Sequence, residues 1–101
     1  MEDKNLIKKA IDKYDVYSPS QREILKLFID ISINNLIEAS VRYISERTQL
    51  KKSTVYFAIN LFLKDGFIQR DIGASKALVL SENKINYIVE IYKKKYSMEK
   101  I

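Results

Sequence analysis

The stretch VRYISERTQLKKSTVYFAINLFLKDGFI, residues 41–68, decides the fold. Its apolar residues predict a short helix over 41–47, a turn at 48–49 and a longer helix over about 52–64. Ile44 and Leu50 flank the turn and are expected to point inward. Five apolar residues at helical spacing form the predicted core stripe of the longer helix: Val55, Ala58, Ile59, Phe62 and Leu63. The Asp65-Gly66 pair should end this helix, because glycine readily takes the left-handed conformation after a last turn.

Two helices are predicted before this stretch. Apolar residues recur at helical spacing over residues 3–15, which predicts an amphipathic helix. The second helix should run from Pro19 to about Asn34, because Ser18 can cap it and Gln21 can complete a capping box. It is apolar on more than one side, which is typical of a helix at the centre of a fold.

Short extended segments and a last helix complete the chain. Residues 36–40 predict a short extended stretch, and its last residue, Ser40, can cap the helix that follows. The β-favouring runs 67–72 and 77–80 flank residues 73–76, so they predict a hairpin. Ser81 can cap a final amphipathic helix over about 82–97.

Length and composition favour one mainly helical domain. The chain has 101 residues, of which only two are glycine and one is proline, and an all-β fold would need more turn residues. We therefore predict a mainly α fold with a small β-hairpin over a single domain, 1–101. Its expected parts are an N-terminal helix at 1–16, a core at 18–80 and a C-terminal helix at 81–101.

The residue types that the chain lacks argue against an enzyme. There is no cysteine and no histidine, so the commonest thiolate nucleophile, general base and metal ligands are missing. We expect no catalysis, no cofactor and no bound metal. The opening Met1-Glu2-Asp3-Lys4 is unlike a signal peptide, and no apolar run is long enough to span a membrane, which favours a cytoplasmic location. The net charge of +5 suits a nucleic acid partner.

The stretch 41–68 resembles the winged helix-turn-helix of bacterial transcription regulators and plasmid replication initiators. The resemblance covers roughly residues 20–80 and is carried by the turn spacing, by the opening 52–56 (KSTVY) and by the exit 64–68 (KDGFI). It implies a winged helix-turn-helix with extra N- and C-terminal helices, in which the helix at 52–64 reads the major groove of double-stranded DNA. A transcription regulator is the leading expectation. The alternatives are a replication or plasmid-maintenance initiation module and a protein-interaction module.

Eight residues are the expected DNA contacts. The predicted first turn of the 52–64 helix supplies lysines, hydroxyls and free backbone N–H groups, which favour a phosphate. Further along the same side, an asparagine can bond adenine in the major groove, and the hairpin adds basic residues. The expected contacts are Lys51, Lys52, Ser53, Thr54, Tyr56, Asn60, Arg70 and Lys76.

Two features depart from the family pattern. Gln49 stands where such turns often have glycine, at some strain if its φ is positive. Phe57 and Leu61 form a second apolar stripe on the 52–64 helix, which indicates either a covering element or a protein partner. The outer helices also need cover for their apolar faces. They either pack within the chain or form a homodimer interface, and we expect the homodimer, with two reading helices about 34 Å apart.

Overall fold

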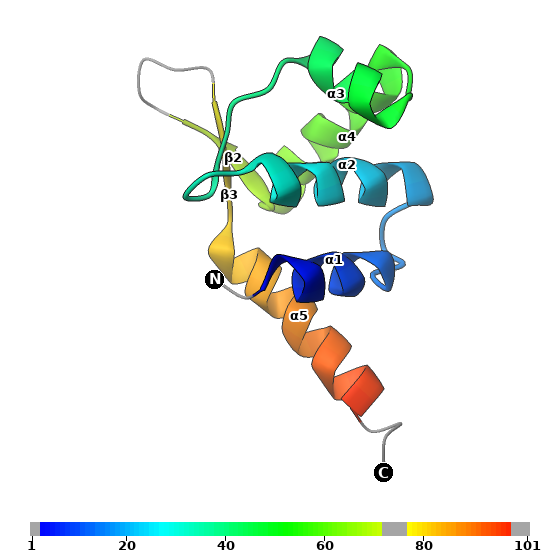
Figure 1. Cartoon of the computed structure of the whole chain (residues 1–101), viewed down its shortest axis with the longest axis vertical. Helices are drawn as coiled ribbons and strands as arrows, with labels where there is room; N and C mark the ends of the chain where they lie inside the picture. Colours follow the sequence, from blue (N-terminus) through cyan, green and yellow to red (C-terminus); the bar gives the residue numbers. More distant parts are fainter. Residues whose placement is uncertain (1–2, 72–76, 98–101) are drawn as a thin grey trace.

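The computed structural model describes residues 3–71 and 77–97, and within them it has five helices and one small sheet (Figure 1). Their order is α1 (Lys4–Asp12), α2 (Pro19–Ile31), β1 (Leu36–Ile37), α3 (Val41–Thr48), α4 (Lys52–Asp65), β2 (Ile68–Arg70), β3 (Leu78–Leu80) and α5 (Glu82–Ser97). This confirms a mainly α architecture with a small antiparallel sheet. No helix in the described part of the chain is both long and apolar enough to cross a bilayer.

Helix α2 lies between α1 on one side and α3 and α4 on the other (Figure 1). The predicted capping box is present: the Ser18 hydroxyl accepts from the Gln21 N–H, and the Gln21 side chain accepts from the Ser18 N–H. Five of its apolar residues are buried: Ile24, Leu25, Leu27, Phe28 and Ile29. A helix with neighbours on two sides must be apolar on both, as the sequence indicated.

The predicted end of α2 at Asn34 is wrong. The helix ends at Ile31, because Ser32 turns extended and its hydroxyl donates to the carbonyl of Ile29. Asn34 and Asn35 then take left-handed conformations, with φ of 52° and 67°. Asparagine tolerates this region better than most residues. The result is a tight turn that delivers the chain into β1.

Helices α3 and α4 flank the predicted turn. Ser40 caps α3 by accepting from the Tyr43 N–H at 3.0 Å. The Ser45 hydroxyl donates to the carbonyl of Leu50, so a side chain of α3 braces the residue after the turn. Leu50 itself is half-buried rather than buried. Gly66 ends α4 with φ of 82°, as predicted for a left-handed glycine.

Gln49 occupies the left-handed region with φ of 59°, so the strain expected of a non-glycine residue is present. Replacing Gln49 with glycine should raise the free energy of unfolding by about 0.5–1 kcal/mol. Urea unfolding followed by circular dichroism measures the change. Gln49→Ala is the matched control, since alanine keeps the Cβ and should give no gain. Equal stability of the glycine variant and the wild type would count against strain at this turn.

The sheet contains one strand more than the predicted hairpin. Its order is β1-β3-β2, and both pairings are antiparallel. β2 and β3 form the hairpin, with Arg70 opposite Leu78. The short extended stretch before α3 supplies β1, in which Ile37 pairs with Leu78 on the other edge of β3. The predicted turn at 73–76 lies outside the described residues.

The two outer helices cover each other. α1 packs against both α2 and α5, and it ends at Asp12 rather than near residue 15. Their apolar faces are buried within the chain; the buried residues are Ile7, Ala10, Ile11, Ile85, Ile88 and Val89. These faces are therefore unavailable for the dimer interface that the sequence suggested. On the rest of α5, Tyr87 and Ile91 remain exposed.

Candidate nucleic-acid interface

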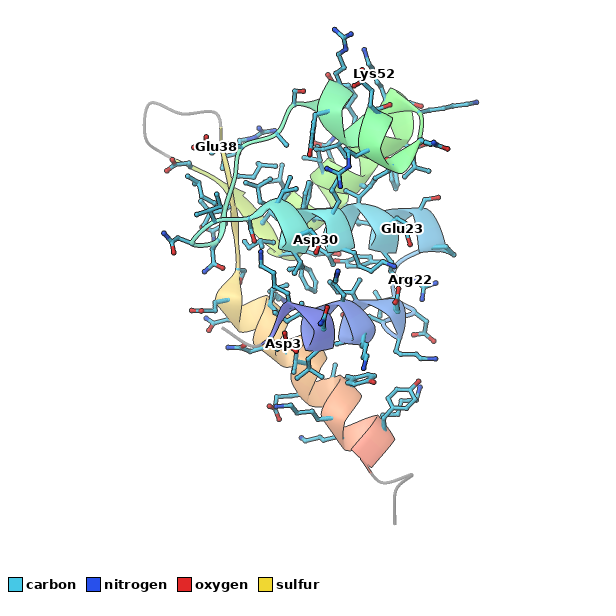
Figure 2. The ribbon with its side chains drawn as sticks, in the orientation of Figure 1. Asp3, Arg22, Glu23, Asp30, Glu38 and Lys52 are labelled. Atoms are coloured by element: carbon cyan, nitrogen blue, oxygen red, sulfur yellow. The ribbon has the colours of Figure 1, made fainter. Side chains whose placement is uncertain are left out.

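The start of α4 is an uncapped, cationic helix terminus. Lys51 occupies the N-cap position, and no side chain caps the first turn. Lys51, Lys52 and Ser53 are exposed, and Thr54 is half-buried. Figure 2 shows Lys52 projecting away from the body, whereas Glu23 and Asp30 lie on α2. Backbone N–H groups at a helix start attract anions, and two flanking lysines strengthen that attraction.

Three other predicted contacts come together beside the middle of α4. Tyr56 and Asn60 of α4 and Arg70 of β2 line one hollow of about 150 Å³. Its other lining residues are apolar: Ala39, Val41, Ile59 and Leu78. Arg70 is held there by the sheet, where it pairs with Leu78. The hollow therefore presents a hydroxyl, an amide and a guanidinium over an apolar floor. Lys76, the eighth predicted contact, lies outside the described residues.

The exposed side of α4 carries no negative charge before its end. Residues 51–64 include lysines but neither aspartate nor glutamate. The one carboxylate of the helix, Asp65, is half-buried and accepts a hydrogen bond from the Tyr17 hydroxyl at 2.7 Å. On α3, Arg42 is paired with Glu46 at 3.0 Å, so its charge is partly offset. The cationic character of this face therefore comes from α4 and Arg70.

Phe57 is a large apolar side chain on this same face, and it is 64% exposed. Its neighbour Tyr56 is 56% exposed. Leu61, in contrast, is half-buried and packs against the core. The predicted second apolar stripe is thus divided: Leu61 is covered by the chain itself, and Phe57 is left in solvent.

An aromatic cluster anchors the other end of α4. Tyr17 is buried, and its ring contacts those of Phe62 and Phe67 with centroid distances of 5.1 and 5.5 Å. The Tyr14 ring lies 5.6 Å from the Tyr17 ring. Tyr17 is not among the residues predicted from the sequence. The available signal was its place directly before the Ser18 cap, where an apolar residue often fixes the entry of the chain into a helix.

Burial and the hydrogen bond to Asp65 raise the pKa of Tyr17 above its ordinary value of 10.0. The folded chain therefore holds this proton more tightly than the unfolded chain does, and stability must fall as pH rises above about 10. Tyr17→Phe should lower the free energy of unfolding by about 1–2 kcal/mol at neutral pH. It should also make the alkaline decline shallower by up to about 1.4 kcal/mol per pH unit.

Urea unfolding from neutral pH to about pH 11 tests both effects. Burial also raises the pKa of Tyr14, so some alkaline decline will remain. Tyr43→Phe is the control, because Tyr43 is exposed and its hydroxyl accepts from Arg47. An unchanged alkaline slope in Tyr17→Phe would show that the buried hydroxyl does not couple folding to pH.

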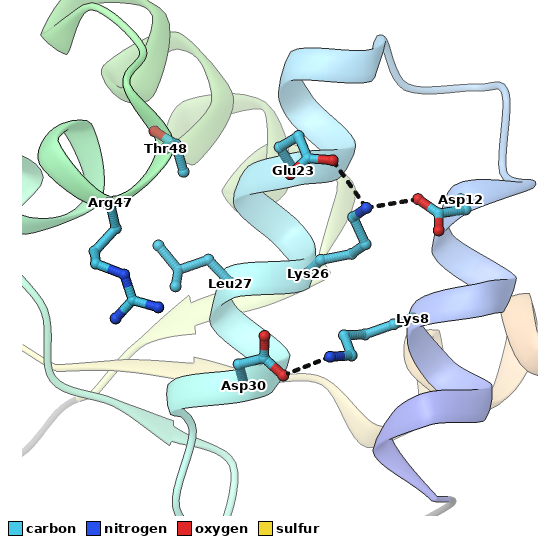
Figure 3. A pocket seen from close by; sticks show the side chains of 8 residues that line it. All are labelled: Lys8, Asp12, Glu23, Lys26, Leu27, Asp30, Arg47 and Thr48. Atoms are coloured by element: carbon cyan, nitrogen blue, oxygen red, sulfur yellow. Dashed lines mark ion pairs between the residues drawn. The ribbon is translucent and has the colours of Figure 1, made fainter.

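A larger polar hollow of about 430 Å³ lies between α1, α2 and the end of α3 (Figure 3). Its charges are largely matched. The Lys26 ammonium lies 2.7 Å from a carboxylate oxygen of Asp12 and 2.8 Å from one of Glu23. These hydrogen bonds raise the pKa of Lys26, and the bond to Asp12 has the larger effect. Lys8 pairs with Asp30 at 3.0 Å. The Lys26–Asp12 and Lys8–Asp30 pairs join α1 to α2, so these charged residues have a structural role.

No protein-family model matches the chain, and neither a curated protein nor a solved structure matches it.

Proposed function

We propose that this chain is a non-catalytic, winged helix-turn-helix protein that binds duplex DNA and acts as a transcription regulator. In this proposal α4 enters the major groove by its N-terminal half, and the β2–β3 hairpin is the wing. The observation that carries the proposal is the exposed face of α4. It opens with an uncapped helix start beside Lys51 and Lys52, bears no carboxylate up to Lys64, and borders the hollow that Arg70 lines.

The chemistry of this face matches what DNA presents. Backbone N–H groups and lysines bind phosphates without regard to sequence, which supplies affinity. Asn60 can bond an adenine edge, and the hydroxyls of Ser53 and Thr54 can bond several bases. Arg70 then reaches a phosphate or a neighbouring groove from the sheet. A replication or plasmid-maintenance initiator would use the same surface in the same way.

Fluorescence anisotropy with a mixed-sequence duplex at several salt concentrations tests the proposal. Affinity should weaken steeply with salt, by about 10³ from low to moderate concentrations if six or so phosphates are contacted. No binding at low salt would reject the proposal.

A protein-interaction module is the second candidate, and one observation favours it: Phe57 is 64% exposed in the middle of α4. Large apolar side chains left in solvent are typical of protein contacts when they form a patch. A module of this kind should show little salt-dependent affinity for duplex DNA. The anisotropy titration therefore separates the two candidates directly.

We also propose a homodimer, which would place two copies of α4 about one DNA turn apart. Since the apolar faces of α1 and α5 are buried in the chain, such a dimer would use residues that remain exposed on α5, namely Tyr87 and Ile91. Light scattering of the same sample gives the mass. A dimer predicts a palindromic binding site, and a monomer would remove that expectation.

A further inference from the structure

Phe57 is a large apolar residue that is 64% exposed, so it does not contribute to the core of the chain. It lies five residues after Lys52, which is about 7.5 Å along the helix axis. Of its neighbours one turn away, Ser53 and Asn60 are exposed, and Thr54 and Leu61 are half-buried. The buried residues of α4, such as Val55 and Phe62, are on the opposite side. Phe57 therefore stands at the centre of the surface that would face the DNA.

We propose that Phe57 reads thymine, by packing its ring against the C5-methyl group in the major groove. This inference rests on the proposed function. The thymine methyl is the apolar feature that base edges present in the major groove, and phenylalanine is among the residues that contact it. The major groove is about 12 Å wide and admits an α-helix, so an exposed side chain in the second turn of an entering helix can contact the base edges.

Charge and packing on α4 favour DNA over a protein as the occupant of this site. Lys51 and Lys52 precede Phe57, Lys64 follows it, and no carboxylate lies between them in the sequence. Leu61, which would have extended an apolar patch, is instead packed against the core. A single phenylalanine within a cationic, polar face matches a thymine methyl group flanked by DNA phosphates. A protein partner with a broad apolar surface would need a larger apolar patch around Phe57.

Asn60 provides a second reader next to Phe57. The two side chains are three residues apart on one face of α4, and both are exposed. An A·T pair shows the thymine methyl on one base and the bidentate adenine edge on the other. Phe57 and Asn60 can thus contact the thymine and the adenine of a single A·T base pair, or of two adjacent A·T base pairs. The preferred site should contain such pairs under the second and third turns of α4.

The test compares two duplexes by fluorescence anisotropy: an A·T-rich duplex, and the same duplex with every thymine replaced by deoxyuridine. The replacement removes the methyl groups and keeps the phosphates and all hydrogen-bonding groups. The wild type should bind the deoxyuridine duplex about fourfold more weakly for each methyl group that packs on a Phe57 ring. Phe57→Ala should bind both duplexes equally, with the salt dependence of the wild type.

Ile33→Ala is the matched control. Ile33 is 75% exposed in the turn between α2 and β1, so the change also truncates an exposed apolar side chain but lies outside α4. This variant should distinguish the duplexes as the wild type does. Circular dichroism checks that both variants are folded, as expected for exposed positions.

Other results would overturn the inference in different ways. If the wild type binds both duplexes with equal affinity, and that affinity falls steeply with salt, the thymine contact is wrong and the proposed function stands. If Phe57→Ala still prefers thymine, another side chain reads the methyl group. If Phe57→Ala instead halves the mass in solution, Phe57 belongs to an interface between copies. If neither duplex is bound at low salt, the proposed function fails and this inference fails with it.

Discussion

The Val55→Asp variant is expected to be unfolded under conditions in which the wild-type chain is folded. Val55 is fully buried on the inward face of α4. The substitution removes about 1.5–3 kcal/mol of apolar burial and places an unpaired carboxylate in the core, which costs several kcal/mol more. Small domains are stable by as little as about 5 kcal/mol, and the two terms together are large enough to exceed such a margin. Far-UV circular dichroism and urea unfolding measure the outcome.

Asn60→Asp is the matched control for this prediction. It places the same carboxylate in the same helix, but at an exposed position, so it should leave the unfolding free energy within about 0.5 kcal/mol of the wild-type value. A Val55→Asp variant that melts like the wild type would show that the inward face of α4 has been assigned incorrectly.

Reversing both charges at the start of α4, with Lys51→Glu and Lys52→Glu together, should weaken duplex binding on the order of 100-fold at low salt. Two attractive phosphate contacts become repulsive, and the slope of affinity against salt should fall by about two. Stability should not fall, because both residues are exposed and acidic side chains favour a helix start. DNA affinity is therefore expected to fall while the free energy of unfolding does not. Anisotropy measures the affinity, and urea unfolding measures the stability.

Lys94→Glu with Lys95→Glu controls for net charge. These lysines are exposed near the end of α5, far from α4 in Figure 1, and the double substitution changes the net charge by the same amount. Binding should weaken only slightly. An equal loss in both double variants would mean that the overall charge, and not the α4 face, governs binding.

The features that the sequence predicted well depend on neighbours along the chain. The capping box at Ser18 and Gln21, the Ser40 cap and the left-handed Gly66 each involve residues within one turn of one another. The inward stripe of α4 follows from helical periodicity alone. Local chemistry fixes these elements, so the positions of Lys51, Lys52 and Asn60 on the exposed face could be predicted too.

The features that it missed depend on residues far apart in the chain. Tyr17 and Asp65 are separated by 48 positions, and no pattern around either residue indicates the other. The pairing of β1 with β3 also joins residues that are far apart in sequence. Leu61 and Phe57 look alike by periodicity, and only packing shows that one is covered and the other exposed. The end of α2 is the exception: it is set locally, by a serine and two asparagines that redirect the backbone.

The order of the sheet has a consequence for how the protein is made. β3 is the middle strand in space but the last strand in the chain, and among the described strands β1 and β2 both pair with it and not with each other. A nascent chain that has emerged from the ribosome as far as Asp71 contains α1 to α4 and both edge strands, but it does not yet contain the strand that joins them. The helices α1 to α4 can pack while translation continues, whereas Arg70 can pair in the sheet only after Leu78 has been synthesised. The hollow beside α4 is thus completed late in synthesis, after the helix that forms one side of it.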